Sequence, residues 1–261
     1  MSPAPVLRVR GVCVAFGGLK ALQDFSLELP EGGLHGLIGP NGAGKTTAFN
    51  VLTGVYRPDA GSFALAGTEL AGMRPSRIAR AGLARTFQNI RLFPDLSVLD
   101  NVRVARHCRS DHGLLATLLR VPSVRRREAD DEARGRELLR LFDLERRAHE
   151  EARGLPYGDQ RRLEIARALA TGPRCLLLDE PAAGMNPAET AALARLIRRL
   201  PAEFGVGVLL IEHDMGLVME ICERITVLDH GVTIACGPPE AIQKDPAVIE
   251  AYLGEPQQAE G

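Results

Sequence analysis

The segment at residues 39–47 limits what this chain can fold into more than any other feature of the sequence. It reads GPNGAGKTT and fits the pattern G-x-x-x-x-G-K-[ST] of a phosphate-binding loop. An apolar run at 34–38 precedes it and another at 48–52 follows it, so we expect a buried strand, the loop and then a helix. The glycines let successive backbone N–H groups turn toward phosphate oxygens, and the helix N-terminus adds the positive end of its dipole.

Individual side chains of this loop suit a nucleotide bound with Mg²⁺. Lys45 can reach the β- and γ-phosphates, and the hydroxyl of Thr46 can ligate the metal ion. The alternative, a glycine-rich turn that carries a lysine by chance, leaves the flanking strand and helix unexplained. The nucleotide-binding residues predicted from the loop are Gly39, Asn41, Gly42, Gly44, Lys45, Thr46 and Thr47.

The composition is that of a soluble globular protein, with 45% hydrophobic and 25% charged residues. The 261 residues suffice for one large domain or for a domain with a subdomain. No apolar run approaches the ~20 residues of a membrane span, and the first residues lack the basic start and apolar core of a secretory signal. We therefore expect a cytosolic chain.

Charge and cysteine content exclude further classes of protein. The net charge of −1 argues against nucleic-acid binding, which usually requires a basic excess. The five cysteines are scattered and form no C-x-x-C pair, which favours reduced thiols over disulfides or a zinc site. Cys175 and Cys236 lie in apolar runs and are expected to fill the core.

Two later apolar runs end in residues that can act on a phosphate. The run at 175–180 reads CLLLDE, which predicts a strand buried on both faces of a parallel sheet with acids at its carboxyl end, where such sheets bind ligands. Asp179 is placed to hold Mg²⁺ and Glu180 to act on a water; the alternative is a pair of solvated turn acids. His213 follows the run at 206–211, and it can be structural, reach a γ-phosphate or order a water.

The remaining signals define the outline of the fold. Phe16, just before a Gly-Gly turn, can either stack on an adenine ring or fill the core, and the loop at 92–94, LFP, is an apolar patch. Interleaved Arg, Asp and Glu in 108–153 predict exposed helix faces with i,i+4 ion pairs rather than a nucleic-acid surface.

Residues 155–160 read as a turn whose Gly158 precedes a helix N-terminus, a second potential phosphate site. We further expect antiparallel strands at 6–16 and 25–29, a strand at 84–88, helices at 161–170 and 187–200, the latter capped by Asn186, and a hairpin turning at 230–231.

These motifs, in this order, resemble the ATP-binding subunit of an ATP-binding cassette (ABC) transporter over nearly the whole chain. The resemblance implies an α/β fold: a P-loop NTPase core with an N-terminal antiparallel β subdomain (1–90 and 157–254), an α-helical insert subdomain (91–156) and a flexible tail (255–261). The matching positions are the Walker A loop at 39–47, the adenine-stacking Phe16, the Q-loop at Gln88, the signature loop at Pro156, Tyr157, Gly158 and Asp159, the Walker B strand at 175–180, the D-loop at 183–186 and the switch histidine His213.

The family pattern also implies chemistry and partners. Glu180 and His213 would be catalytic, and Thr46, Gln88 and Asp179 would surround Mg²⁺. Two cassettes, identical or different, would pair head to tail with ATP between the Walker loop of one and the signature loop of the other. Transmembrane permease subunits would dock near Gln88 and the 92–94 patch at the cytoplasmic face of the membrane, a periplasmic solute-binding protein would act indirectly, and no nucleic acid would be involved.

Within the family the chain is most similar to LivG-type subunits of branched-chain amino acid importers, through 16–22, 85–88, 161–167, 179–184 and 252–254. Relatives for urea or short amides share several of these stretches, and a lipopolysaccharide-type export ATPase ends similarly. Soluble ABC ATPases that act on nucleic acid or ribosomes are the alternative from another class, and a P-loop kinase leaves the signature loop unexplained. Two departures from the family are Pro156, where the pattern Leu-Ser-Gly-Gly-Gln has its serine, and Asn186, where the D-loop has an aspartate.

Overall fold

The computed structural model describes residues 5–107 and 122–253, and its contacts divide the chain into two compact units. The first unit comprises Met1–Arg85 with Arg174–Gly261, and the second comprises Thr86–Pro173. Cys108 and the predicted tail at 255–261 lie outside the described residues. Within the described ranges, no helix is both long enough and apolar enough to cross a membrane.

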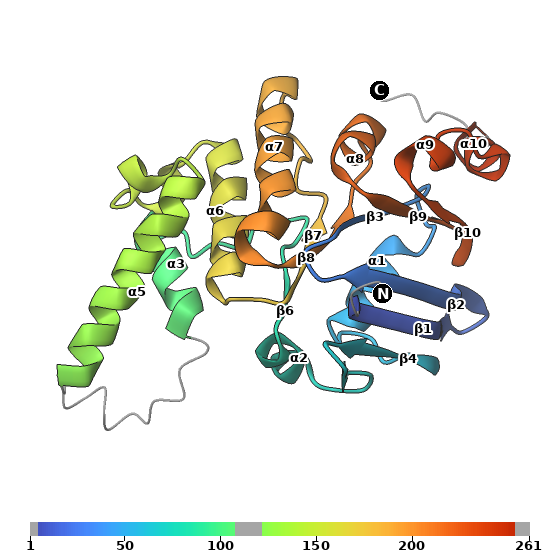
Figure 1. Cartoon of the computed structure of the whole chain (residues 1–261), viewed down its shortest axis with the longest axis horizontal. Helices are drawn as coiled ribbons and strands as arrows, with labels where there is room; N and C mark the ends of the chain where they lie inside the picture. The colour runs from blue at the N-terminus through green and yellow to red at the C-terminus, as the bar shows by residue number, and fades with distance from the viewer. Residues whose placement is uncertain (1–4, 108–121, 254–261) are drawn as a thin grey trace. The chain divides into compact units, whose positions relative to one another are not determined.

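A six-stranded sheet in the order β10-β9-β3-β8-β7-β6 forms the centre of the first unit (Figure 1). All neighbours are parallel except β10, which pairs antiparallel with β9 at one edge. Every residue of β3, β7 and β8 is buried, which explains their unbroken apolar sequences. The strands are β3 (Leu34–Ile38), β6 (Leu83–Arg85), β7 (Cys175–Asp179), β8 (Gly207–Ile211), β9 (Arg224–Asp229) and β10 (Val232–Gly237).

The second sheet of this unit is antiparallel, as predicted, with the order β2-β1-β4-β5. Helix α1 (Lys45–Leu52) shares one buried cluster with both sheets: its Phe49 packs with Phe25 and Phe63 from the antiparallel sheet and with Leu37 from β3. This cluster fixes the helix that follows the phosphate-binding loop. The strands are β1 (Pro5–Phe16), β2 (Leu19–Pro30), β4 (Ala60–Leu65) and β5 (Thr68–Glu69).

Helices cover both faces of the six-stranded sheet, with α7 and α8 on the side opposite α1 (Figure 1). Helix α7 begins as predicted: the side chain of Asn186 accepts from the N–H of Glu189, and the carboxylate of Glu189 accepts from the N–H of Asn186. The helices of this unit are α2 (Pro75–Ala81), α7 (Pro187–Phe204), α8 (Met215–Ile221), α9 (Pro239–Ile242) and α10 (Pro246–Leu253).

The second unit is helical. Helix α3 packs against α5 and α6, and two short 3₁₀ turns, Glu145–Arg147 and Ala152–Gly154, connect α5 to α6. The predicted i,i+4 ion pairs are present on α5, where Arg134 meets Asp130 and Arg136 meets Glu132. The side chains of 125–127 lie outside the described residues. The helices are α3 (Val98–His107), α5 (Pro122–Leu141) and α6 (Tyr157–Ala170).

Several predictions need correction. The strand expected at 84–88 is β6 and ends at Arg85, where the chain enters the second unit. The turn expected at 155–160 is largely helix, because Pro156 adopts an extended conformation that caps α6 and Tyr157 already begins it. Cys236 is exposed and does not fill the core, since β10 is an edge strand, whereas Cys175 is buried as expected.

The extent of the helical unit also differs from the predicted segment 91–156. The unit runs from Thr86 to Pro173 and includes the whole of α6. The physical reason is the buried ion pair of Arg161 and Glu164 on α6. Arg161 also donates to the carbonyl of Phe87 at 2.9 Å, and Glu164 also accepts from the N–H of Arg91 at 3.2 Å. These bonds join α6 to the segment that follows β6.

The central strand β3 carries a buried histidine that should make stability depend on pH. Burial, together with the nearby positive charge of Arg224, lowers the pKa of His35 from 6.5 to about 4. The folded protein therefore keeps His35 neutral while the unfolded chain binds a proton below pH 6.5, so this stability is complete at neutral pH and is lost as the pH falls toward 4. We expect a loss of about 2 kcal/mol between pH 7.5 and 5 from this residue.

Chemical denaturation at the two pH values tests this expectation. In His35→Asn the position cannot titrate, so the difference in unfolding free energy between pH 7.5 and 5 should shrink by that amount. His149→Asn, at an exposed position, is measured alongside as the control for replacing a histidine with asparagine. An unchanged pH dependence in His35→Asn would contradict the assignment.

Candidate nucleotide site

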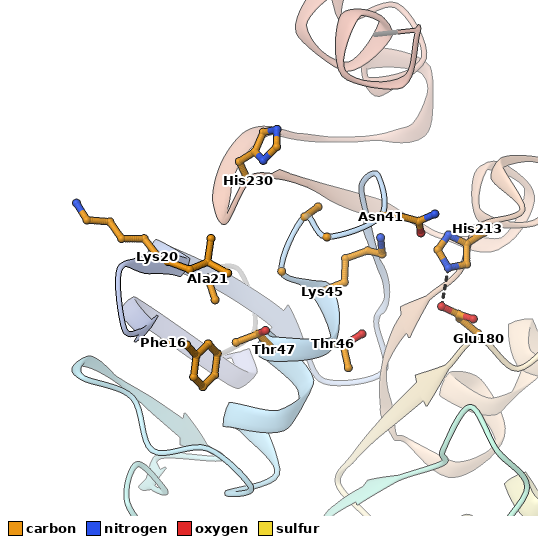
Figure 2. Close-up of a pocket in the computed structure, with 14 residues that line it drawn as sticks. Phe16, Lys20, Ala21, Asn41, Lys45, Thr46, Thr47, Glu180, His213 and His230 are labelled. Carbon is orange, nitrogen blue, oxygen red and sulfur yellow. Dashed lines mark hydrogen bonds and ion pairs between the residues drawn. The ribbon is translucent and has the colours of Figure 1, made fainter. Parts of the chain in front are cut away.

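One cavity of about 320 Å³ lies in the first unit, at the carboxyl ends of its parallel strands. In Figure 2, Phe16 and Thr47 lie at one end of it and Glu180 and His213 at the other, with Lys45 and Thr46 between them. The phosphate-binding loop therefore shares a single cavity with the residues predicted to act on the phosphate. The lining residues are Phe16, Leu19, Lys20, Ala21, Asn41, Gly42, Ala43, Gly44, Lys45, Thr46, Thr47, Glu180, His213 and His230.

Close backbone packing explains two glycines of the loop. Gly39 has φ +148°, and a Cβ there would lie 2.0 Å from the carbonyl oxygen of Leu228 in β9. Gly44, which caps α1, has φ +102°, and a Cβ would lie 2.5 Å from the carbonyl oxygen of Ala21 in β2. The loop thus lies directly against both neighbouring strands, and no other residue type fits at these positions.

The hairpin between β9 and β10 also holds the loop. His230 and Gly231 both have positive φ, the combination that a two-residue type I′ turn requires. The N–H of Gly231 donates to the carbonyl of Ala43 at 3.0 Å. The carbonyl of Gly231 accepts from the N–H of Gln23 at 2.8 Å. The turn thereby connects the phosphate-binding loop to β2.

The ammonium group of Lys45 is buried at the base of the loop. Its Nζ donates to the carbonyl oxygens of Gly39 at 2.5 Å and Pro40 at 2.7 Å. These bonds keep the cation inside the loop, facing the cavity that Asn41 and Thr46 also line. A positive charge held at the base of a glycine-rich loop is suited to bind polyphosphate.

Phe16 is 47% exposed, so it is not a core residue. Its ring makes an edge contact with Tyr56, with ring centroids 5.1 Å apart and planes at 70°. The ring thus lines the cavity in a fixed orientation, and stacking on adenine stays a prediction for it.

The predicted catalytic pair is in direct contact. Nε2 of His213 lies 2.6 Å from Oε1 of Glu180, and the Glu180 side chain is only 13% exposed (Figure 2). Glu180 follows β7 with φ +47°, an unusual conformation for a residue with a side chain. With only 13% of its side chain exposed, Glu180 is not a solvated turn acid.

Glu212, immediately before His213, was not singled out from the sequence. It is buried, and its carboxylate accepts from the N–H of Ala182 at 2.7 Å and of His213 at 3.2 Å. Burial raises the pKa of Glu212, and these backbone N–H groups oppose that shift by favouring the charged form. The only sequence signal for Glu212 was its place directly after an apolar strand. Asp214 lies in the same place and merely caps α8, so that signal does not single out Glu212.

Asp179, predicted to hold Mg²⁺, forms a buried ion pair that the sequence did not reveal. Its Oδ2 accepts from Arg85 at 2.7 Å, and both side chains are 7% exposed. Arg85 also donates to the side chain of Asn50 on α1 at 2.8 Å. The carboxylate of Asp179 and the hydroxyl of Thr46 are the hard oxygen donors that Mg²⁺ prefers, so the donor chemistry fits this ion.

The second unit holds the other predicted site residues. Gln88 and Pro156 are exposed, and Tyr157 is 44% exposed. Gly158 is buried in the first turn of α6, and Asp159 forms ion pairs with Arg147 and Arg162. Pro156 therefore faces solvent at the N-terminus of α6, and Tyr157 beside it is partly exposed.

Arg161 of α6 connects the two predicted loops of this unit, and the sequence analysis missed it. Its guanidinium donates to the carbonyls of Phe87 and Gln88 and to the hydroxyl of Tyr157, the last at 3.0 Å. The buried Glu164 lies 3.3 Å from it as its counter-ion. The backbone of the predicted Q-loop and the start of the predicted signature helix are thus held by one side chain.

Comparison with known proteins identifies the family. Residues 22–183 match the family model for the ABC transporter, and residues 232–257 match the model for the branched-chain amino acid ATP-binding cassette transporter. A crystal structure of the ADP conformation of MJ1267, an ATP-binding cassette of an ABC transporter, superposes with a TM-score of 0.82 at 28% identity, covering 96% of this chain and 99% of that one. The chain belongs to the ATP-binding cassettes of ABC transporters, as its motifs predicted.

Curated relatives agree along nearly the whole length. The chain is 49% identical to the high-affinity branched-chain amino acid transport ATP-binding protein LivG of Salmonella typhimurium, covering 96% of this chain and 98% of that protein. It is 48% identical, with the same coverage, to BraF of Pseudomonas aeruginosa, described in the same words. The chain is an ATP-binding and ATP-hydrolysing subunit of an ABC importer.

Breaking the buried Arg85–Asp179 pair should cost far more stability than breaking an exposed pair. Arg85→Gln leaves the Asp179 carboxylate buried without its cation, which costs about 3–5 kcal/mol. The pair between Arg8 and Glu28, 40% and 60% exposed, is the control, since Arg8→Gln should cost about 1 kcal/mol or less. Urea unfolding of both variants makes the comparison, and equal losses would show that Asp179 does not depend on Arg85.

Proposed function

We propose that this chain hydrolyses ATP to drive the import of branched-chain amino acids. The observation that carries the proposal is the cavity in which the phosphate-binding loop meets Glu180 and His213. The match of residues 232–257 to the branched-chain amino acid model supports this substrate class over the lipopolysaccharide-export and nucleic-acid alternatives.

In this proposal the polyphosphate lies along the loop from Gly39 to Thr47, where backbone N–H groups and Lys45 neutralise its charge. The adenine stacks on Phe16 at the other end of the cavity. Mg²⁺, when bound, would neutralise charge on the phosphate oxygens, and Thr46 and Asp179 are the residues of the first unit that would hold it.

Glu180 is the general base of this proposal. The water oxygen attacks the γ-phosphorus, its proton passes to the Glu180 carboxylate, and the bond from the γ-phosphorus to the bridging oxygen breaks to leave ADP. His213 orients Glu180 through their 2.6 Å hydrogen bond and can contact the γ-phosphate.

The proposed assembly contains a second cassette and transmembrane permeases, with a periplasmic binding protein acting on the permeases, at the cytoplasmic face of the membrane. The signature loop, Pro156 to Asp159, would complete the ATP site of the second cassette. The permeases would contact the 92–94 patch. Phe93 is 46% exposed there, and the buried Asn101 holds its backbone by bonds to the Phe93 N–H at 2.9 Å and carbonyl at 3.0 Å.

Glu180→Gln tests the proposed chemistry. The amide keeps the shape of the side chain and cannot accept the proton, so ATP should still bind while hydrolysis falls by about a hundredfold or more. Lys45→Ala should instead abolish binding at micromolar nucleotide, because the phosphates lose their cation. Nucleotide binding by fluorescence and phosphate release measure the two effects, and wild-type hydrolysis by Glu180→Gln would exclude Glu180 as the base.

Pro156→Ser tests the signature loop. Pro156 offers a phosphate neither a hydroxyl nor an N–H, and a hydrogen bond to a charged phosphate contributes about 1.5–3 kcal/mol. In a transporter with two different cassettes, Pro156→Ser should raise hydrolysis at the partner's Walker site by about tenfold or more. Pro156→Ala, which restores the N–H alone, is the control. No gain in a reconstituted complex would mean that the helix N-terminus suffices.

A further inference from the structure

A ring of hydrogen bonds joins the loops that follow β7 and β8, and Glu212 is its central member. Oε1 of Glu212 accepts from the N–H of Ala182 at 2.7 Å, and Oε2 accepts from the N–H of His213 at 3.2 Å. The imidazole of His213 is hydrogen-bonded to Glu180. The backbone from Glu180 to Ala182 then completes the ring. The ring is closed, and Glu212 belongs to it without lining the cavity.

A carboxylate is the side chain that this arrangement requires. Its two oxygens are acceptors only, so it can face an N–H donor from each loop at once. An amide of the same shape would point its own N–H₂ at one of those donors. Glu212 is 4% exposed, and burying an acid is costly without hydrogen bonds. The N–H groups of the two loops compensate this cost, and the same bonds hold the loops in place.

The conformation of Glu180 shows why a restraint is needed. Its φ of +47° costs free energy for a residue with a side chain, so neighbouring structure must maintain it. Backbone bonds supply part of that support, since the N–H of Glu180 donates to the carbonyl of Ile211 at 2.9 Å. The bond from Ala182 to Glu212 fixes the chain on the other side of Glu180.

We infer that Glu212 is a positioning residue for ATP hydrolysis, which holds the two loops together so that Glu180 and His213 stay in contact. The inference rests on the proposed function, because it gives Glu212 no contact with ATP and acts only through the proposed catalytic pair. It predicts that loss of the carboxylate lowers kcat and leaves nucleotide affinity at the phosphate-binding loop unchanged.

Steady-state hydrolysis by the full-length chain tests this split. Glu212→Gln should lower kcat about tenfold or more with KM for ATP unchanged, since a backbone N–H bond to a charged group is lost. Glu220→Gln, an exposed acid on α8, is the matched control and should retain wild-type values. A wild-type kcat in folded Glu212→Gln, or a rise in KM with kcat unchanged, would overturn the inference.

A double-mutant cycle distinguishes positioning from a general structural effect. If Glu212 acts through His213, then adding Glu212→Gln to His213→Ala should lower kcat little beyond His213→Ala alone. Multiplied losses would show that Glu212 acts independently of the pair and would overturn the inference. Amide hydrogen exchange gives a readout without activity: the N–H of Ala182 should lose protection in Glu212→Gln.

A shorter acid keeps the test decisive if the amide variant does not fold. Glu212→Asp preserves the charge, and its carboxylate, one methylene nearer the backbone, cannot span both donors, so kcat should fall by the same route. Glu180→Gln is measured alongside. Wild-type hydrolysis by Glu180→Gln would reject the proposed function itself. If Glu180→Gln is inactive while folded Glu212→Asp and Glu212→Gln are both fully active, only the role of Glu212 is rejected.

Discussion

The close packing of the phosphate-binding loop against its neighbouring strands is the constraint on which the rest of the site depends. Gly39 lies against the Leu228 carbonyl and Gly44 against the Ala21 carbonyl, with no room for a side chain at either contact. Because both sheets contact the loop directly, its N–H groups and Lys45 have fixed directions before any ligand binds. Preorganised donors stabilise developing charge without reorganisation, so the fold itself prepares the loop for a polyphosphate.

Buried charges at the carboxyl ends of the strands complete this arrangement. Arg85 and Asp179 are paired where β6 and β7 end, and Glu212 receives backbone N–H groups where β8 ends. Buried ions of this kind rarely improve stability over apolar residues. Their role in the proposed mechanism is instead to orient neighbouring groups that act on phosphate or metal.

Sequence patterns predicted those features whose causes are local. The apolar runs gave β3, β7 and β8, Asn186 and Glu189 marked the start of α7, and the glycine-rich pattern located the cavity. The partners of Arg85 and Glu212 lie 94 and 30 residues away in the chain, and no pattern of spacing reports such contacts. Arg161 was missed for the same reason, and α6 began earlier than predicted because Pro156 acts as a cap rather than as part of a turn.

The hairpin at His230 and Gly231 makes the phosphate-binding loop depend on a segment that lies far from it in the sequence. The loop that begins at Gly39 bonds through Ala43 to Gly231 and is covered by Leu228, and both of these residues lie far from it in the sequence. A nascent chain that stops before β9 therefore has the whole glycine-rich sequence and lacks its support. We therefore expect nucleotide binding to require β9 and β10, because the glycine-rich sequence without them lacks the contacts that fix its shape.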